Sequence, residues 1–299
     1  MTAPERVKSP KIRRSVREKW TIALMLGVPA MIVVGLVWIP TVFTVILSFA
    51  RWDGIGGTSS IEWIGTQNYA DAVQAYPPFQ QALQNNVLWL VFLFLVPTVI
   101  GILLAILLDK NLKGSRLYQS IFYVPVVLSM ALIGFIWQLI YSTEGGVLNS
   151  LLGTDVDWLG DPDINIWAVM VAAGWRHTVY IMLLYLAGLK AIDPSVREAA
   201  VMDGAGPIRT FFSVIFPLMK NTNLLIIVIT VIEALRAFDL VWVINKGRNG
   251  LELISALVTA NVVGEASRVG FGSALATIML GISLVFIALY LAIVLRSKD

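Results

Sequence analysis

The sequence lacks cysteine altogether and contains a single histidine, His177, among its 299 residues. The absence of cysteine excludes disulfides, thiolate metal sites and thiol nucleophiles. One histidine leaves little basis for histidine catalysis or for a metal centre. The chain also lacks two glycine-rich phosphate-binding patterns, Gly-x4-Gly-Lys-[Ser/Thr] and Gly-x-Gly-x-x-Gly. We therefore expect no ATP bound through those patterns, and no metal or other cofactor held by this chain.

Charge is scarce as well. Charged residues make up 14% of the chain, 58% is hydrophobic, and the mean hydropathy is +0.80. Soluble domains contain about 25% charged residues, so this composition predicts a membrane protein. A helix needs about 20 mostly apolar residues to cross a bilayer. Six stretches satisfy that length: 20–50, 87–108, 117–141, 164–189, 218–244 and 269–295. We predict an all-α polytopic membrane protein with six transmembrane helices, the first too long to be a secretory signal.

Lysine and arginine are distributed unevenly around these stretches. Residues 1–19 contain seven of them and are predicted to form a basic cytoplasmic tail that faces membrane lipid. When the tail, the second and fourth loops and the C-terminus are placed on one side, that side holds 16 basic residues and the other holds 4. The positive-inside rule then puts both termini in the cytoplasm. We divide the chain into the tail, 1–19, and a transmembrane domain, 20–299. The charge pattern does not indicate nucleic-acid binding.

The fourth loop, residues 193–217, is the most strongly patterned polar segment. Asp193, followed by a proline, fits the N-cap of a helix. Ser195 with Glu198 three residues later fits a capping box, so two starts are compatible with the sequence. Gly204 would end this helix.

A second short helix is predicted to begin at Pro207. It would carry an apolar stripe with helical spacing, formed by Ile208, Phe211, Phe212 and Ile215. Small residues on either side of the break, Ala199, Ala200 and Ala205, would let the backbone lie deep in the groove of a partner.

This loop resembles the EAA loop of permease subunits in binding-protein-dependent ABC importers. The resemblance rests on Glu198-Ala199-Ala200, Gly204 and the later Phe216-Pro217. The fuller run 198–205 is similar to the branch that imports sugars, the maltose and glycerol-phosphate type. Val214 and Phe216 stand where the family usually has isoleucine and leucine. The resemblance covers nearly all of residues 20–295.

In that family this loop docks on the cytosolic ATPase, so we name residues 193–217 the coupling loop. The resemblance implies that six residues form the contact: Glu198, Ala199, Ala200, Asp203, Gly204 and Ala205. Glu198 would pair with an arginine of the ATPase, cap its own helix, or do both. Gly204 is expected to adopt a left-handed or otherwise tight turn that a side chain would obstruct. Asp203 is compatible with a simply solvated position.

The resemblance also implies the rest of the machine. The partners would be a second homologous permease, two ATP-binding subunits and an extracytoplasmic solute-binding protein in a bacterial inner membrane. ATP and magnesium would bind the ATPase, so this chain would not be an enzyme. The expected solute is a sugar or a sugar-like polyol. Two alternatives stay open: the same machine for glycerol phosphate, a polyamine or another polar solute, and a self-contained secondary transporter or membrane enzyme.

Charged residues inside the fourth and fifth stretches are costly in a bilayer and tend to face a cavity or one another. Glu233, Arg236 and Asp239 are spaced three apart, which predicts one face of a helix. Arg176 lies near the middle of the fourth stretch and could reach the two acids. These side chains would either form an ion cluster that locks helices together or line a path for a polyhydroxyl solute. Tyr180 would offer such a solute an aromatic ring.

Other features of the spans and loops predict less. Trp175 and Tyr185 fit either helix packing or contact with a sugar ring, and His177 fits a satisfied core or cavity histidine. Prolines inside the second and third stretches, Pro97 and Pro125, predict kinks. Residues 142–163 are acidic without a basic residue and are interpreted as a solvated face. Residues 245–249 depart from the Thr-x-Gly-Gly-Pro pattern that is common in the family, which weakens any assignment of gate contacts there.

Overall fold

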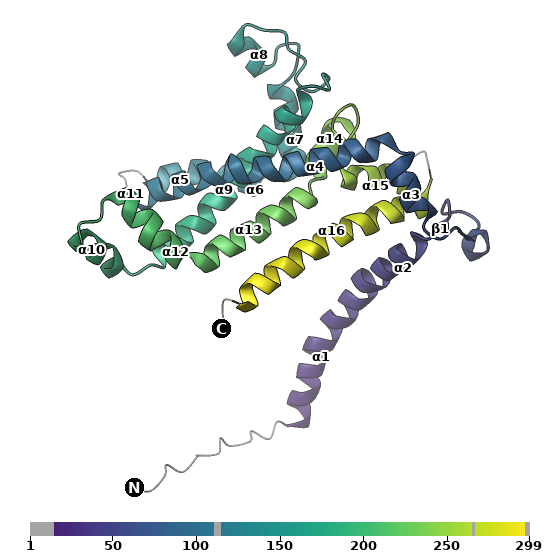
Figure 1. The fold of residues 1–299 in the computed structure, drawn as a ribbon, viewed down its shortest axis with the longest axis horizontal. Helices are drawn as coiled ribbons and strands as arrows, with labels where there is room; N and C mark the ends of the chain where they lie inside the picture. The colour runs from purple at the N-terminus through teal and green to yellow at the C-terminus, as the bar shows by residue number, and fades with distance from the viewer. Residues whose placement is uncertain (1–14, 111–114, 265–266, 297–299) are drawn as a thin grey trace. The chain divides into compact units, whose positions relative to one another are not determined.

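The computed structural model describes residues 15–110, 115–264 and 267–296. The tail prediction therefore falls mostly outside the described residues. The chain divides into two compact units, residues 1–46 and 47–299, and each is described by itself. Both are built almost entirely from helices (Figure 1).

Unit 1 is one long apolar helical segment. Its parts follow one another without a gap: α1 (Val16–Val33), the π-helical turn η1 (Val34–Trp38) and α2 (Ile39–Leu47). Ser15 and Glu18 form a capping box at its start, in which each side chain accepts the other residue's backbone N–H. The helix begins at Val16, four residues before the start of the predicted span 20–50, and it ends at Leu47, before the end of that span.

Unit 2 contains the remaining elements. They are β1 (Ala50–Arg51), η2 (Gly57–Ser60), β2 (Glu62–Trp63), α3 (Gln67–Gln74), α4 (Pro77–Leu95), α5 (Pro97–Asp109), α6 (Ser115–Val127), α7 (Met130–Ile140), α8 (Val147–Leu152), α9 (Asn165–Lys190), α10 (Pro194–Met202), α11 (Pro207–Thr210), η3 (Phe211–Ile215), α12 (Phe216–Leu218), α13 (Lys220–Leu235), α14 (Asp239–Asn245), α15 (Ile254–Val262) and α16 (Val269–Arg296). The two strands form a short antiparallel pair in which Ala50 lies opposite Trp63. In Figure 1 the α10–α12 segment lies at the end of this unit where α9 ends and α13 begins.

Four helices in the described part of the chain are long and apolar enough to cross a membrane. They are Val16–Leu47, Pro77–Asp109, Asn165–Lys190 and Val269–Ile293. Helices α6 and α7 form a further span if counted together, although they are bent by 106°. The remaining predicted span, 218–244, is divided into the 16-residue α13 and the shorter α14. The all-α class is confirmed, and the chain interrupts two of the six predicted spans.

The bend between α6 and α7 lies at residues 128–129 rather than at Pro125, where the sequence predicted a kink. Ser129 has an extended backbone and its side chain accepts the N–H of Leu132 at 3.2 Å, so it caps α7 as a new helix. The cap, and not the proline inside α6, thus determines where the direction changes.

Helices α5 and α9 have the most extensive contact of any helix pair among the described residues of unit 2. An added Cβ at Gly101 would lie 2.7 Å from the carbonyl oxygen of Thr178, so only glycine allows this approach. Farther along the same interface Ala105, Leu108, Ile181 and Met182 are buried in one hydrophobic cluster. The two helices therefore form a tight pair, and Arg197 of the coupling loop contacts Asp109 and Leu189 near their C-terminal ends.

Candidate functional site

A cavity of about 390 Å³ lies within unit 2. It is lined from α4, α7, α9, α13 and α14, and by the residues between the last two helices. All five residues that the sequence singled out for a solute path line it: Arg176, Tyr180, Glu233, Arg236 and Asp239. Further lining side chains that the sequence did not single out include Trp89 and Met130.

The break in α13 is what brings the charged residues of this segment to the cavity. Spacing alone predicted that Glu233, Arg236 and Asp239 share one face of a continuous helix, and this was wrong. The helix ends at Leu235, and a new helix starts at Asp239. Ser255 stabilises the break, because its hydroxyl donates to the free carbonyl of Ala237. The three side chains converge on one cavity through an interruption of the helix.

These charged residues do not pair with one another. The ion pairs found among the described residues are Arg51–Glu62, Lys190–Asp109 and Arg197–Asp109. Arg176 and Glu233 are half-buried in the cavity wall, and the Nε atom of Arg176 is buried without a hydrogen-bond partner. Of the two alternatives, the ion cluster that locks helices together is therefore not found among the described residues. Two guanidinium and two carboxylate groups remain available to the contents of the cavity.

His177 lies in the same wall and is buried. Its Nε2 lies 3.2 Å from the hydroxyl of Thr230, so it is a satisfied cavity histidine, as the sequence suggested. The two other aromatic candidates of α9 do not line the cavity. Tyr185 is buried and donates to Asn223 Oδ1 at 2.7 Å, and Trp175 contacts Trp137 edge to face. Both therefore serve helix packing.

The coupling loop forms two helical pieces, as predicted. Of the two possible starts, the structure takes Asp193, whose carboxylate accepts the N–H of Ser195 at 2.9 Å. This backbone hydrogen bond lowers the pKa of Asp193 below its usual value. Glu198 is exposed and, in the described part of the chain, makes no hydrogen bond, so it does not cap its own helix. Its carboxylate is available to a partner.

Gly204 ends α10 with φ of +75°, the left-handed conformation expected of it. An added Cβ would meet nothing within 4 Å, so glycine is required here by backbone geometry and not by lack of space. Ala200 is buried, Ala205 is half-buried, and Ala199 and Asp203 are exposed. The exposed residues flank the turn, and the buried alanine anchors it.

Large apolar side chains are exposed on this loop. Val201, Met202 and Ile208 are 65%, 87% and 77% exposed. The predicted stripe of the second piece is split, since Ile208 and Phe212 are exposed while Ile215 is buried. The reason is the π-helical turn η3, in which one extra residue per turn rotates the side chains out of α-helical spacing.

A comparison with protein families resolves the identity of this arrangement. Residues 97–298 match the family model described as the binding-protein-dependent transport system inner membrane component. This chain belongs to that family. It is thus a membrane component of a transport system. The helices that are long and apolar enough to cross a membrane are consistent with this family.

Similar members of the binding-protein-dependent transport family align over most of this chain. The xylose/arabinose import permease protein XacH of Haloferax volcanii is 32% identical over 275 residues, which cover 89% of this chain and 85% of the relative. The sulfoquinovosyl glycerol transport system permease protein SmoG of Agrobacterium fabrum is 31% identical over 287 residues, covering 93% and 91%. The trehalose/maltose permease MalF of Thermococcus litoralis is 32% identical over 206 residues, covering 68% and 70%.

The fold of this transport component is similar to that of a solved structure. A chain in the crystal structure of a bacterial ABC transporter involved in import of the acidic polysaccharide alginate matches with a TM-score of 0.79 at 18% identity. The match covers 95% of this chain and 97% of that chain. The likeness establishes the shared fold of the two chains.

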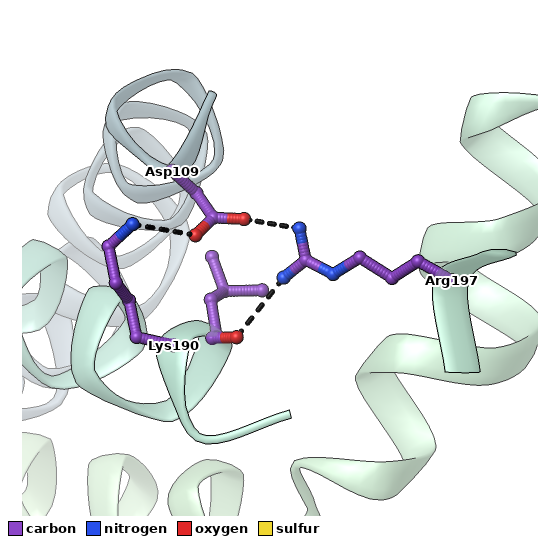
Figure 2. A network of polar contacts seen from close by, with 4 residues as sticks. Asp109, Lys190 and Arg197 are labelled. Carbon is purple, nitrogen blue, oxygen red and sulfur yellow. Dashed lines mark hydrogen bonds and ion pairs between the residues drawn. The ribbon is translucent and has the colours of Figure 1, made fainter. Parts of the chain in front are cut away.

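One polar network of this transport component escaped the sequence analysis (Figure 2). Asp109 forms ion pairs with Lys190 at 3.5 Å and with Arg197, which also donates to the carbonyl of Leu189 at 3.1 Å. We call Asp109, Lys190, Arg197 and the Leu189 carbonyl the Asp109 network. Asp109 and Arg197 are 88 residues apart in the chain, and no local pattern links them.

Proposed function

We propose that this chain is the permease subunit of an ATP-driven importer and forms half of the translocation path for a sugar or a sugar-like solute. The observation that carries the proposal is the cavity in which Arg176, Glu233 and Arg236 converge with Tyr180 and Asp239 without forming ion pairs. Arg176 and Glu233 are half-buried, and Arg236 and Asp239 are exposed. Charges within membrane spans are costly unless they pair or face water or a solute. A polyhydroxyl solute can accept from the arginines and donate to the carboxylates.

The balance of charge favours a neutral solute. Two arginines and two acids line the cavity, so its formal charge cancels when histidine is neutral. A phosphate group would favour several arginines without competing carboxylates. Three similar relatives are named for xylose/arabinose, for trehalose/maltose and for sulfoquinovosyl glycerol, which supports a sugar or sugar derivative. Glycerol phosphate is the second candidate and would exploit Arg176 and Arg236.

The coupling loop supports an ATPase that is a separate subunit. Its exposed apolar side chains, Val201, Met202 and Ile208, suit a groove on a protein partner, and Glu198 is available to pair with a basic residue there. We further propose the remaining parts of the machine: a second homologous permease, two ATP-binding subunits that hold ATP and magnesium, and an extracytoplasmic solute-binding protein. The distribution of basic residues supports a cytoplasmic location for the coupling loop and for both termini.

The test is to purify the tagged chain from gently solubilised membranes and to measure ATP-driven uptake of radiolabelled sugars in proteoliposomes. Met202→Glu should lower the amount of copurified ATPase about tenfold or more, because it places a charge in an apolar contact. Leu151→Glu is the matched control, since Leu151 is 78% exposed in α8, outside the coupling loop. This control should retain the ATPase.

Purification of the wild-type chain without an ATPase, together with uptake in its absence, would replace the proposal with a secondary transporter. Uptake of glycerol phosphate in preference to neutral sugars would change the substrate class and leave the machine unchanged.

A further inference from the structure

We propose that Asp109 is a positioning residue that fastens the coupling loop to the ends of α5 and α9, so that movement of α10 is transmitted to the cavity. The inference rests on the proposed function. Asp109 is the last residue of α5, Lys190 is the last residue of α9, and Arg197 lies in α10. One carboxylate thus holds three helices together through its two oxygens, each engaged by a different cation.

The location of Asp109 argues against an ordinary surface ion pair. Its side chain is only 10% exposed, whereas that of Lys190 is 47% exposed. An acidic residue at the last position of a helix is disfavoured by the negative end of the helix dipole. Helix stability therefore does not explain the aspartate at this position. Its ion pairs with Lys190 and Arg197 do explain it, because they neutralise the buried carboxylate. The carboxylate depends on tertiary partners.

Arg197 attaches α10 through two hydrogen bonds with fixed geometry. One nitrogen of its planar guanidinium bonds Asp109, and the other bonds the carbonyl of Leu189 in the last turn of α9 (Figure 2). That carbonyl lies among the last four of the helix, which have no partner inside it, and it also accepts the backbone N–H of Ile192 at 3.4 Å. A lysine could supply the charge but not this two-pronged geometry. Arg197 therefore links α10 to both α5 and α9.

Within the described ranges, few other side chains attach α10 to α5 and α9. Ala200 is the only buried residue of α10, and the remainder of the helix is exposed or half-buried. Chain connectivity joins α10 to α9 through residues 191–193. Among the described residues, the Asp109 network links α10 itself to α5 and α9 through side chains, whereas the later part of the coupling loop contacts these helices through Phe211, Ile215 and Phe216.

The far end of this connection is the cavity. Helix α9 runs without interruption to Lys190 and carries Arg176 and Tyr180 in the cavity wall. Fourteen residues separate Arg176 from Lys190, which corresponds to roughly 21 Å along a helix. Close packing at Gly101 locks α5 to α9, so the two move together. Displacement of α10 would therefore shift the arginine side of the cavity.

The test measures solute imported per ATP hydrolysed in proteoliposomes that contain the complete importer. Asp109→Asn keeps the size of the side chain and removes its charge. We expect the ATPase to copurify as with the wild type, while solute imported per ATP falls about fivefold or more. Arg197→Gln should lower the ratio equally. The double variant should be no worse than either single variant, because both break one connection.

The matched control is Asp155→Asn, an exposed carboxylate in the acidic segment 142–163, which should leave the ratio unchanged. A wild-type ratio in Asp109→Asn would overturn the inference and leave the importer intact. Loss of the ATPase from this variant would also overturn it, since the network would then serve docking. If Asp109→Asn fails to accumulate, Arg197→Gln carries the same test. Absence of ATP-driven uptake by the wild type would instead contradict the proposed function.

Discussion

Among the described residues, the Nε atom of Arg176 is buried in the cavity wall without a hydrogen-bond partner. We predict that Arg176→Gln lowers the rate of ATP-driven sugar uptake about tenfold or more. A hydrogen bond to a charged group contributes about 1.5–3 kcal/mol, and the solute loses it in the variant. Uptake in proteoliposomes measures the effect, with ATPase copurification as a check that assembly is unaffected.

Tyr185→Phe is the matched control, since its hydroxyl bonds Asn223 away from the cavity. It should retain uptake within about twofold, by the small net contribution of a neutral hydrogen bond. Unchanged uptake in Arg176→Gln would show that the arginine is structural and would remove it from the solute path.

Gly204 gives a second prediction at this scale, based on its backbone conformation. Gly204→Ala should weaken ATPase binding about fivefold to thirtyfold, because a side chain in the left-handed region costs about 1–2 kcal/mol. The control is Gly206→Ala in the same loop, where φ is −67° and an added Cβ would meet nothing. Titration of the purified permease with the ATPase measures both affinities. Equal affinities for the two variants would contradict the argument.

The environments of some residues could be predicted from the sequence, for a physical reason. A charge within an apolar stretch stands out, so the amino-acid pattern alone was enough to assign Arg176, Glu233 and Asp239 to one environment. Gly204 stands out at the end of a helix pattern. Asp109 does not, because an acid at the edge of a span resembles any solvated boundary residue. Its burial is determined by Arg197, whose contact depends on the tertiary fold.

At the scale of elements, the two π-helical turns share one feature of sequence. Both η1 and η3 end two residues before a proline, Pro40 and Pro217. A proline ring clashes with the carbonyl four residues earlier, which here belongs to Leu36 or Ser213, inside the widened turn. Widening the turn accommodates the ring without ending the helix. Within η3, Phe212 is exposed on the coupling loop and Ile215 is buried.

The N-cap of α10 gives a prediction with a pH dependence. The folded-state pKa of Asp193 is lowered, so its contribution is present above the unfolded pKa and lost as the pH falls through the folded pKa. The cap should therefore be complete at neutral pH and should weaken only below about pH 4. Asp193→Ala should accelerate hydrogen exchange at the Ser195 amide at about pH 7.

Asp193→Asn is the control for this cap, since asparagine also accepts the backbone N–H. At neutral pH it should exchange like the wild type, and it should lose the acid sensitivity. An acid-sensitive Asp193→Asn variant would show that another group titrates in α10.

Interruptions of helices were the least predictable elements. Residues 218–244 have enough apolar content for one continuous span, yet the helix ends at Leu235. The break depends on Ser255, which satisfies a carbonyl from 18 residues away along the chain. Likewise, the sequence predicted a kink at Pro125, whereas the chain changes direction at Ser129, which caps α7. Apolar content specifies which residues enter the membrane, whereas tertiary hydrogen bonds specify where a helix stops.

At the scale of the whole molecule, orientation is open to a direct test. Since the chain has no cysteine, a single introduced cysteine is a unique label site. We predict that a membrane-impermeant maleimide labels Leu151→Cys in intact cells and labels Met202→Cys only in inverted vesicles. Both side chains are exposed, so protection reflects the side of the membrane. Labelling of both variants in intact cells would contradict the proposed topology.

Composition alone predicted the fold class, because six apolar stretches in one chain leave no soluble alternative. The family match over residues 97–298 agrees with that prediction. The position of each helix relative to its neighbours could not be predicted, since close approaches such as Gly101 against Thr178 depend on partners elsewhere in the chain.

The Asp109 network also constrains the order of events on the ribosome. Arg197 is synthesised 88 residues after Asp109, which takes roughly 4 to 18 s at about 5–20 residues per second. For most of that interval the carboxylate at the end of α5 has neither of its cations, because Lys190 is also yet to be made. The three-helix connection therefore closes only after α9 has been synthesised, and nascent chains stalled before residue 190 should lack it.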